Sequence, residues 1–390
     1  MKILIFAETY YPDIKGGGEF STKQMAQGLA GKGHEVVVRC LGMENKAEKI
    51  NGVVVKRRYS GPLSEHFIAN TKNNRIKDPF KPTDKIVRKR RDLYYERKWY
   101  EAYRSVIMKE KPDIVHTASP MTYLGRYNLW KAAFDLGIPV SHVCRGHSLL
   151  ELKFLGGIFD RYNVRRNAAA SSYLTALAAP SYYMLERHNR AGIRGQCFND
   201  VIYNAVDFQP VSLSEDGMEQ KEDLILYAGE IKKEKGIDTL IRAMEGLEGV
   251  RLLLIGKEMP EGFVKKDGKA RVLDWMDREE LYTYMKKAKA VVLPSEWNEP
   301  FGRILIEAVF NGSLGIGSDK GGIPEVLDHN KDYIFKSGDA CALKSRIVRV
   351  LGMSDHEYME EVKKLQKTVA GIADEAYIDS WERFFMQQIQ

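Results

Sequence analysis

The residue pattern with the clearest chemical meaning is a pair of glutamates, Glu299 and Glu307, that flank Pro300-Phe301-Gly302. Proline at a first helical position and a neighbouring glycine leave backbone N–H groups unpaired at the positive end of a helix dipole. Glu307 lies further along in a run of Ile, Leu, Ala and Val, where an unpaired carboxylate would be costly to bury. A hydroxyl-rich ligand such as ribose would satisfy it. A helix cap followed by a boundary glutamate would also produce this pattern.

Glycine-bearing turns recur where apolar runs give way to helical patterns, at 16–18, 229–236 and 321–322. Glycine lets backbone N–H groups approach an anion at a helix N-terminus, and Lys235 in the second turn can neutralise a phosphate. Each turn alone also fits a plain tight turn or a solvated charged loop. Open α/β sheets bind ligands where several such turns meet at the carboxyl ends of their strands. The turns of the second half therefore predict a ligand site there.

Short apolar runs alternate with amphipathic stretches along almost the whole chain. This alternation predicts parallel sheets covered by helices on both faces, and hence α/β Rossmann-like layers. The expected strands are 2–7, 35–41, 53–57, 113–117, 138–143, 174–179 and 201–203 in the first half, and 224–228, 250–255, 290–293, 314–317 and 333–335 in the second.

The chain of 390 residues is longer than one hydrophobic core usually supports, so two domains are expected. The polar stretch 205–222 separates two complete α/β patterns and marks the seam. We predict an N-terminal domain of residues 1–206, completed by a final helix at 374–390, and a C-terminal domain of residues 207–373.

The net charge of +7 comes from one segment, because residues 72–111 hold fourteen Lys and Arg against six acidic residues. A long helix is expected over about 84–110, with apolar and aromatic residues among the cations. This composition is typical of a helix that lies on an anionic membrane surface. A solvated insertion is the alternative, and an electropositive mouth for an anionic acceptor is a third reading.

Cysteine usage and the N-terminus indicate the compartment. The cysteines at 40, 144, 197 and 341 form no C-x-x-C pair, so neither a disulfide framework nor a zinc site is predicted. No apolar run reaches about 18 residues, and the opening MKILIFAETYYPD resembles a first strand more than a secretory signal. We expect a cytoplasmic protein, peripheral at most to the inner membrane surface.

At this point the motifs resemble those of a known family. Glu299-x7-Glu307 around Pro-Phe-Gly, followed by Gly-Gly-Ile-Pro-Glu at 321–325, closely resembles the C-terminal signature of glycosyltransferase family 4, of the group 1 type. Pro12, Gly16-Gly17-x-Glu19 and Gly-His-Glu-Val at 33–36 are similar to the opening domain of that family, and Asn-Ala-Val-Asp at 204–207 to its hinge. The resemblance covers nearly the whole chain.

The resemblance implies the GT-B architecture, in which two Rossmann-like domains face each other across a cleft and the C-terminal helix crosses back to the N-terminal domain. It also implies retaining transfer of a sugar from a nucleoside-diphosphate sugar to an acceptor hydroxyl. UDP is the favoured nucleotide by its frequency in the family. Neither a metal ion nor another cofactor is expected, and the acceptor is a small molecule, a lipid-linked group or a glycan.

The same resemblance assigns donor-binding roles. Glu307 would hold the ribose hydroxyls, Lys235 the diphosphate, and Glu299 the donor-sugar hydroxyls next to the reacting carbon. The N–H groups of Phe301 and Gly302 would receive phosphate or sugar oxygens. Gly16 and Gly17 would let the first domain close over the diphosphate.

Two departures from the family pattern affect this assignment. Glu230 stands where the family usually has a phosphate-binding arginine, so Arg303 is the candidate substitute, with Lys232 and Lys233 as alternatives. Ala118 stands where many members have a histidine, which makes His147 the candidate to reach the donor sugar. Arg145, beside it, and Glu19 are the candidates for contact with the acceptor.

Other functions remain open at this level. A nucleotide-sugar epimerase could share the fold, although it would need an acid–base set that the motifs do not supply. A sugar phosphorylase would need a pyridoxal-phosphate lysine and a longer chain. A binding protein could use the basic segment, but no nucleic-acid-binding module surrounds it, so no nucleic-acid partner is expected.

Overall fold

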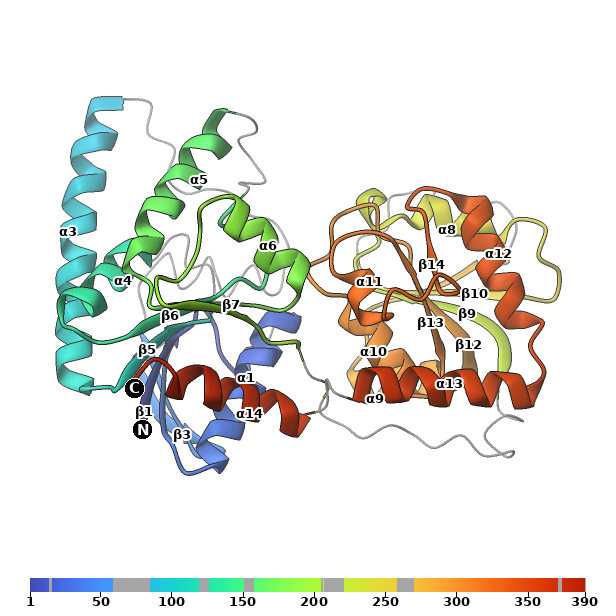
Figure 1. The fold of residues 1–390 in the computed structure, drawn as a ribbon, viewed down its shortest axis with the longest axis horizontal. Helices are drawn as coiled ribbons and strands as arrows, with labels where there is room; N and C mark the ends of the chain where they lie inside the picture. The colour runs from blue at the N-terminus through green and yellow to red at the C-terminus, as the bar shows by residue number, and fades with distance from the viewer. Residues whose placement is uncertain are drawn as a thin grey trace. The chain divides into compact units, whose positions relative to one another are not determined.

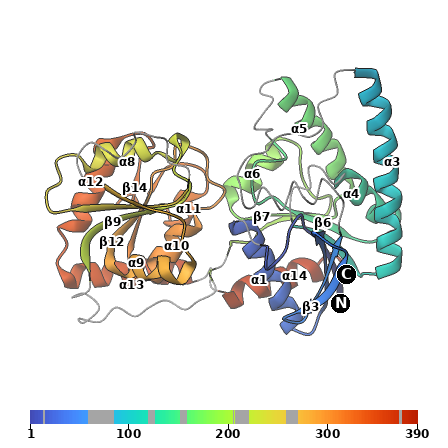
Figure 2. The same ribbon diagram turned by 180° about the vertical axis from the view of Figure 1, so that it is seen from behind.

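The computed structural model describes residues 1–13, 16–58, 85–118, 126–150, 158–204, 206, 221–257, 270–370 and 374–389. The chain divides into two compact units, one of Met1–Ile202 with Tyr377–Gln390 and one of Tyr203–Ala376 (Figures 1 and 2). The predicted boundary at 206/207 falls shortly after this division, next to residues 207–220, which lie outside the described part of the chain.

The first unit is built on an eight-stranded sheet with the order β3-β4-β2-β1-β5-β6-β7-β8. Neighbouring strands pair in parallel except β3 and β4, which pair antiparallel. The strands are β1 (Lys2–Phe6), β2 (Glu35–Leu41), β3 (Lys46–Ile50), β4 (Val53–Arg58), β5 (Ile114–Thr117), β6 (Val140–Val143), β7 (Ala176–Ala179) and β8 (Phe198–Val201).

Helices cover both faces of this sheet (Figure 1). They are α1 (Gly17–Gly31), α3 (Lys85–Glu110), α4 (Arg126–Asp135), α5 (Ile158–Ala170), α6 (Tyr182–Arg190) and α14 (Asp374–Met386), with the short 3-10 helix η1 (Ser171–Tyr173). The inner strands are buried along nearly their whole length, as parallel strands between two helical layers must be.

The second unit has a six-stranded, entirely parallel sheet with the order β11-β10-β9-β12-β13-β14. Its elements are β9 (Glu222–Ala228), η2 (Lys233–Lys235), α8 (Ile237–Met244), β10 (Arg251–Ile255), β11 (Ala270–Leu273), α9 (Arg278–Lys287), β12 (Ala288–Leu293), α10 (Arg303–Phe310), β13 (Leu314–Ser318), α11 (Ile323–Val326), β14 (Ile334–Phe335), α12 (Ala340–Leu351) and α13 (Asp355–Ala370). This strand order is that of the Rossmann fold, and its switch point lies between β9 and β12. The predicted class, two Rossmann-like α/β units, is confirmed.

Three strands differ from the expectation. β3 and β11 were not predicted, because both are edge strands whose side chains stay partly exposed and supply no apolar run. The strand expected at 201–203 lies at Phe198–Val201. Its burial pattern is intermediate rather than buried, so hydrophobicity gave little guidance to its position.

The C-terminal helix α14 returns to the first unit, as predicted. The hydroxyl of Tyr377 donates to the carbonyl of Ser21 in α1 at 2.8 Å, and Glu382 accepts from Lys32 at 2.5 Å. A Cβ on Gly28 would lie 2.3 Å from Cδ1 of Ile378, so the two helices pack closely here and a larger residue would require the Ile378 side chain to shift. The final segment therefore completes the N-terminal core.

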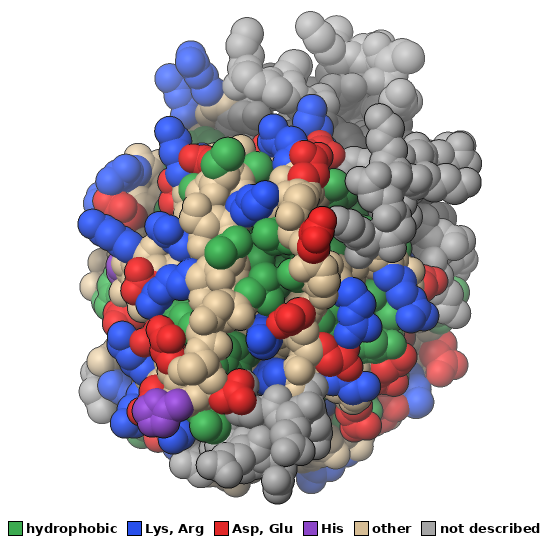
Figure 3. Space-filling view, turned by 90° about the vertical axis from the view of Figure 1, so that its right-hand side faces the viewer, with side chains coloured by type: hydrophobic (Ala, Val, Ile, Leu, Met, Phe, Trp, Pro, Cys, Tyr) green, Lys and Arg blue, Asp and Glu red, His purple; other side chains and the backbone are tan. Residues whose placement is uncertain are grey.

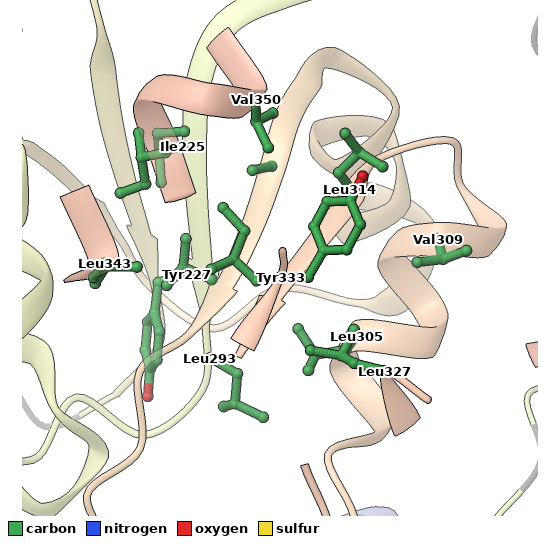
Figure 4. Packing of buried hydrophobic residues seen from close by; sticks show 14 of the residues in the cluster. Ile225, Tyr227, Leu293, Leu305, Val309, Leu314, Leu327, Tyr333, Leu343 and Val350 are labelled. Atoms are coloured by element: carbon green, nitrogen blue, oxygen red, sulfur yellow. The ribbon is translucent and has the colours of Figure 1, made fainter. Parts of the chain in front are cut away.

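The second unit has a hydrophobic core between its sheet and helices (Figure 4). Ile225 and Tyr227 from β9 pack with Leu305 and Val309 from α10 and with Leu343 from α12. This core fixes α10 against the strands, and so it fixes the place at which the helix begins.

Candidate functional site

The glycine-bearing turns of the second unit meet at the carboxyl edge of its sheet. The carbonyl of Glu234, in the turn after β9, accepts hydrogen bonds from the N–H groups of Glu296 and Trp297, which follow β12, at 3.0 and 2.9 Å. The carbonyl of Glu299 accepts from Gly322 N–H, in the turn after β13, at 2.8 Å. The turns that the sequence singled out are thus joined at the switch point of the sheet.

Two glycines make this close packing possible. A Cβ on Gly236 would lie 1.9 Å from the carbonyl oxygen of Pro294, and one on Gly321 would lie 2.0 Å from that of Glu299. Both residues also have positive φ, +72° and +63°, which side-chain-bearing residues rarely adopt. The glycines are required because the turns touch backbone to backbone.

Lys235 and Glu299 form an ion pair at the centre of these turns. Nζ of Lys235 lies 2.7 Å from Oε1 of Glu299, and the two side chains are 16% and 12% exposed. The ammonium also lies 4.4 Å from the centre of the Trp297 ring, within cation–π range. Low exposure and two partners hold the lysine in one place, where a diphosphate would meet a fixed positive charge.

Glu307 is buried on α10 and paired with arginines. Nε of Arg303, one turn earlier, lies 2.9 Å from its carboxylate, and the two side chains are 11% and 6% exposed. Nη2 of Arg278, at the start of α9, lies 3.7 Å from the same oxygen. The polar partner that this carboxylate needs is therefore present within the chain, and Arg303 is committed to Glu307.

The start of α10 lies three residues later than the sequence predicted, because Pro300 precedes the helix instead of occupying its first position. Gly302 is the N-cap residue with a φ of +105°, and the helix begins at Arg303. The ring of Phe301 is buried and stacks on Tyr203 at a centroid distance of 5.5 Å, which anchors this turn in the unit's core. The phosphate-binding role of the Phe301 and Gly302 N–H groups stays a prediction.

Glu230 is paired within its own turn. Its carboxylate pairs with Nζ of Lys232 at 3.1 Å, and its side chain is half exposed. Its carbonyl accepts a 2.7 Å hydrogen bond from the hydroxyl of Tyr227. Lys232, one of the alternative cations, is therefore held by the glutamate that replaces the family's arginine.

In the first unit, the glycine turn after β1 begins α1. Gly16 is the N-cap, and its N–H donates to Oε2 of Glu19 at 3.1 Å. Glu19 thus closes the helix start, which is a structural task in addition to the predicted acceptor contact. Residues 14 and 15 of the same turn lie outside the described residues.

Arg145 and His147 follow β6 in the same unit. A Cβ on Gly18 would lie 3.6 Å from Cδ of Arg145, so this arginine reaches the start of α1. Its guanidinium carbon lies 5.9 Å from the centre of the buried Trp381 ring of α14. His147 is buried, and its ring centre lies 6.5 Å from that of Tyr183.

The buried His116 of β5 lies beneath these residues. Its ring packs edge-on against Trp381 at 5.2 Å, and its Nδ1 lies 3.0 Å from the hydroxyl oxygen of Ser141. Burial, together with the nearby Arg145, holds the pKa of His116 well below its usual value. This histidine is therefore neutral and belongs to the core.

Three residues of these clusters were not found from the sequence. Arg278 approaches Glu307 from a different helix, and nothing in its local pattern marks it. Trp381 supports Arg145 from the far end of the chain. Of the three, Trp297 could have been predicted from the sequence. It stands two residues before Glu299, and an aromatic ring within a charged turn often packs against a cation.

A metal site needs clustered ligand residues, and a membrane span needs a long apolar helix, within the part of the chain that the structure describes. No group of three or more His, Cys, Asp and Glu residues in that part of the chain is arranged to hold a metal ion. Among the same residues, no helix has the length and apolar character needed to cross a membrane.

Comparison with known families covers nearly the whole chain. The model of "Glycosyltransferase Family 4" matches residues 15–209, and that of "Glycosyl transferases group 1" matches residues 212–368. The chain belongs to glycosyltransferase family 4. The second match spans Lys235, Glu299 and Glu307, and the first spans Arg145 and His147.

Two relatives of this family-4 glycosyltransferase match most of its length. An uncharacterized glycosyltransferase of Methanocaldococcus jannaschii is 26% identical over 371 residues, which is 86% of this chain and 85% of the relative. An uncharacterized protein from the cps region of Klebsiella pneumoniae is 26% identical over 345 residues, 84% of this chain and 87% of the relative.

Solved structures show the same fold. A sucrose-phosphate synthase from Thermosynechococcus elongatus superposes with a TM-score of 0.74 at 20% identity, covering 99% of this chain and 98% of that chain. HepE of Anabaena, solved in complex with UDP, gives a TM-score of 0.71 at 15% identity, covering 99% of this chain and all of that chain. The family-4 glycosyltransferase therefore has the fold of GT-B enzymes.

Proposed function

We propose that this glycosyltransferase moves a sugar from a UDP-sugar to an acceptor hydroxyl, with retention at the anomeric carbon and without a metal ion. The observation that carries the proposal is the joined set of turns at the switch point, which holds Lys235 against Glu299 and begins α10 beside them. Structures of HepE in complex with UDP and with UDP-glucose, which share this fold, support the choice of nucleotide.

The chemistry follows from the charges. Departure of a nucleoside diphosphate builds negative charge on its phosphates, and a fixed cation with oriented N–H groups stabilises that charge. Lys235 supplies the cation, and the amides of Phe301 and Gly302 supply the dipoles. We assign Glu299, which forms an ion pair with Lys235 at 2.7 Å, to accept hydrogen bonds from the donor sugar.

Glu307 is assigned to the ribose hydroxyls, and Arg303 to holding Glu307. Nε of Arg303 lies 2.9 Å from one carboxylate oxygen, and a carboxylate has about four lone-pair positions, so ribose hydroxyls can share it. Arg303 thereby positions the carboxylate instead of meeting the diphosphate. Lys235 and the backbone amides of Phe301 and Gly302 then stabilise the diphosphate without the positive charge that the family's arginine supplies at the position of Glu230.

The acceptor is assigned to the first unit. Arg145 lies against the start of α1, and Gly16 and Gly17 begin that helix. A guanidinium beside the N-terminal end of a helix suits an acceptor with anionic or hydroxyl groups. We assign His147 to the donor sugar and Glu19 and Arg145 to the acceptor.

Retention is assigned to attack on the same face from which the nucleotide leaves. In this mechanism the leaving phosphate accepts the proton of the acceptor hydroxyl. The bond between the anomeric carbon and the phosphate oxygen breaks while the bond to the acceptor oxygen forms. No dedicated base is needed.

Calorimetric titration of the purified chain with UDP-, GDP- and ADP-glucose tests the donor assignment. We expect saturable binding of the UDP compound and a loss of about tenfold or more in Glu307→Gln, since charge-assisted hydrogen bonds contribute roughly 1.5–3 kcal/mol. Glu360→Gln, an exposed glutamate of α13, is the matched control. Equal UDP affinity in Glu307→Gln and the parent would refute the ribose assignment.

The reaction type needs a separate measurement. Proton NMR of the product formed from UDP-α-glucose should show the small anomeric coupling of an α-glycoside, and turnover should survive EDTA. A β-product would refute retention. Formation of an epimerised nucleotide sugar without acceptor would favour the epimerase.

We also propose that the enzyme works in the cytoplasm, with α3 in contact with an anionic membrane. Its described C-terminal part exposes Arg97, Arg104 and Lys109, and Met108 is half exposed beside them. The cysteines among the described residues are all free, which fits a reducing compartment.

Co-sedimentation with vesicles tests this contact. The parent should sediment with phosphatidylglycerol vesicles at low salt and less with neutral ones, and Gln at positions 97, 104 and 109 should reduce recovery. Gln at the exposed lysines 363, 364 and 367 of α13 is the control. Equal recovery of both triple variants would refute the role of α3.

A further inference from the structure

The second unit contains a cavity at the end of its sheet opposite to the glycine turns. Its volume is about 560 Å³, and it lies at the beginning of β9, β10 and β11, next to the last turns of α9. Cavities of this size hold small-molecule ligands. Figure 3 shows one face of the molecule, on which hydrophobic side chains are surrounded by charged ones. The cavity is lined by apolar and charged residues together.

Strand register brings the charged residues of the cavity together. Arg251 of β10 pairs with Leu224 of β9, and Arg271 of β11 pairs with Leu253 of β10. Paired residues of parallel strands point to the same face, as do residues two apart on one strand. Both arginines therefore lie on one face together with Leu224 and Leu253, which form its apolar floor. Glu222, two residues before Leu224, shares that face.

Helix α9 forms the other wall. Leu224 and Leu253 belong to the hydrophobic cluster against which α9 packs, and Tyr284 is a partly buried member of it. Tyr284 and Lys287, nearly one turn apart on α9, both line the cavity. The wall thus adds a third cation and a phenol to the two arginines.

The charges of the cavity do not cancel. Its lining has three cations, Arg251, Arg271 and Lys287, against one carboxylate, Glu222, which forms an ion pair with Arg251. Over the residues that the structure describes, Arg271 and Lys287 have no acidic partner within ion-pair distance. Two residues whose positive charges are unpaired among the described residues, both exposed to solvent, therefore line a concave space with an apolar floor and an aromatic ring.

We propose that this cavity is a second ligand site, for a phosphate monoester carried on a small ring. The fork of Arg271 and the ammonium of Lys287 suit the phosphate oxygens, and a guanidinium can bind two of them at once. Leu224, Leu253 and Tyr284 suit the ring. The site is separate from the donor site, because it lies at the amino-terminal edge of the strands while Lys235 and Glu299 lie at the carboxyl edge.

Phenyl phosphate is the probe that tests the proposal, with inorganic phosphate and phenol as its two halves. In titrations of the full chain at constant ionic strength, phenyl phosphate should bind saturably and more tightly than either half. Arg271→Gln and Lys287→Gln should each weaken it about tenfold, the effect of losing one charge-assisted contact. Lys286→Gln, the neighbour on α9 that does not line the cavity, should change it less than twofold.

Controls separate this site from the donor site and from a membrane. UDP affinity in the absence of phenyl phosphate should be unchanged in Arg271→Gln, which also shows that the variant is folded. Binding to phosphatidic-acid vesicles should be equal in the parent and Arg271→Gln. The proposal would be overturned if phenyl phosphate showed no saturable binding or if all three variants lost the same affinity for it. Vesicle binding that depends on Arg271 would also overturn it.

Discussion

The pair of Arg303 and Glu307 allows a quantitative test of the donor site. The two side chains are 11% and 6% exposed and meet at 2.9 Å, so removing one partner leaves the other charge in a place of low solvation. Breaking a buried pair from one side costs about 3–5 kcal/mol. Arg303→Met should fall near the lower end of that range, because Arg278 remains 3.7 Å from the carboxylate. Glu307→Gln, which keeps an acceptor, should cost about 1.5–3 kcal/mol.

Scanning calorimetry measures these losses as changes in melting temperature. For a unit of this size, each kcal/mol of lost stability lowers the Tm by about 2–4 °C, so Arg303→Met should lower the Tm of the second unit by about 6–12 °C. The double variant should lose at least about 1 kcal/mol less than the sum of the singles, because contacting residues are coupled. Additive losses would refute the pairing.

Nucleotide binding then separates the two roles open to Arg303. If it positions Glu307 for the ribose, Arg303→Met should weaken uridine and UDP by the same factor. A cation that meets the diphosphate would affect UDP and leave uridine unchanged. A loss confined to UDP would therefore show that Arg303 binds phosphate. Arg303 would then supply the charge that the family's arginine supplies at the position of Glu230.

Three further outcomes are expected. Lys235→Met should reduce UDP affinity about tenfold or more, whereas Lys233→Met, in the same turn, should change it less than twofold. Equal losses of affinity in titrations of the two variants would refute the assignment of Lys235 as the cation that binds the diphosphate. Burial lowers the pKa of Lys221 to about 7, below its value in the unfolded chain, so the unfolded state binds more protons between about pH 7 and 10.5. The parent should gain stability relative to Lys221→Met as pH rises through that window, by at most about 1.4 kcal/mol per pH unit in urea unfolding, and parallel curves would contradict the burial. Trp381→Ala should destabilise the first unit by about 3–5 kcal/mol, against little change for the exposed Met386→Ala, and an unchanged Tm would show that α14 does not complete this core.

Much of this molecule follows from the sequence alone. The apolar runs KILIF, EVVVRCL and AKAVVL become strands because they are long enough to be buried on both faces of a parallel sheet. Gly236, Gly302 and Gly321 stand where the backbone takes positive φ. Motifs of this kind are local, so the two-unit fold and the position of the donor-side turns could be predicted.

The edge strands and the ion pairs between side chains could not be predicted from the sequence. β3 and β11 pair with neighbours through backbone hydrogen bonds, which any sequence can make, and their exposed side chains carry no signal. The sequence predicted that Glu307 lies in an apolar helix and that its carboxylate needs a polar partner. It could not show that Arg303 of the same helix turns toward it, because that depends on rotamers selected by packing.

The tertiary structure alone decided which distant side chains meet. Lys235 and Glu299 lie on turns after different strands, and they form an ion pair because β9 and β12 are neighbours at the switch point of the sheet. Arg251 and Arg271 share the second cavity because register aligns β10 with β11. Spacing along a chain sets what one element presents, whereas contacts between elements depend on strand order and register, which are fixed only when the whole core is packed.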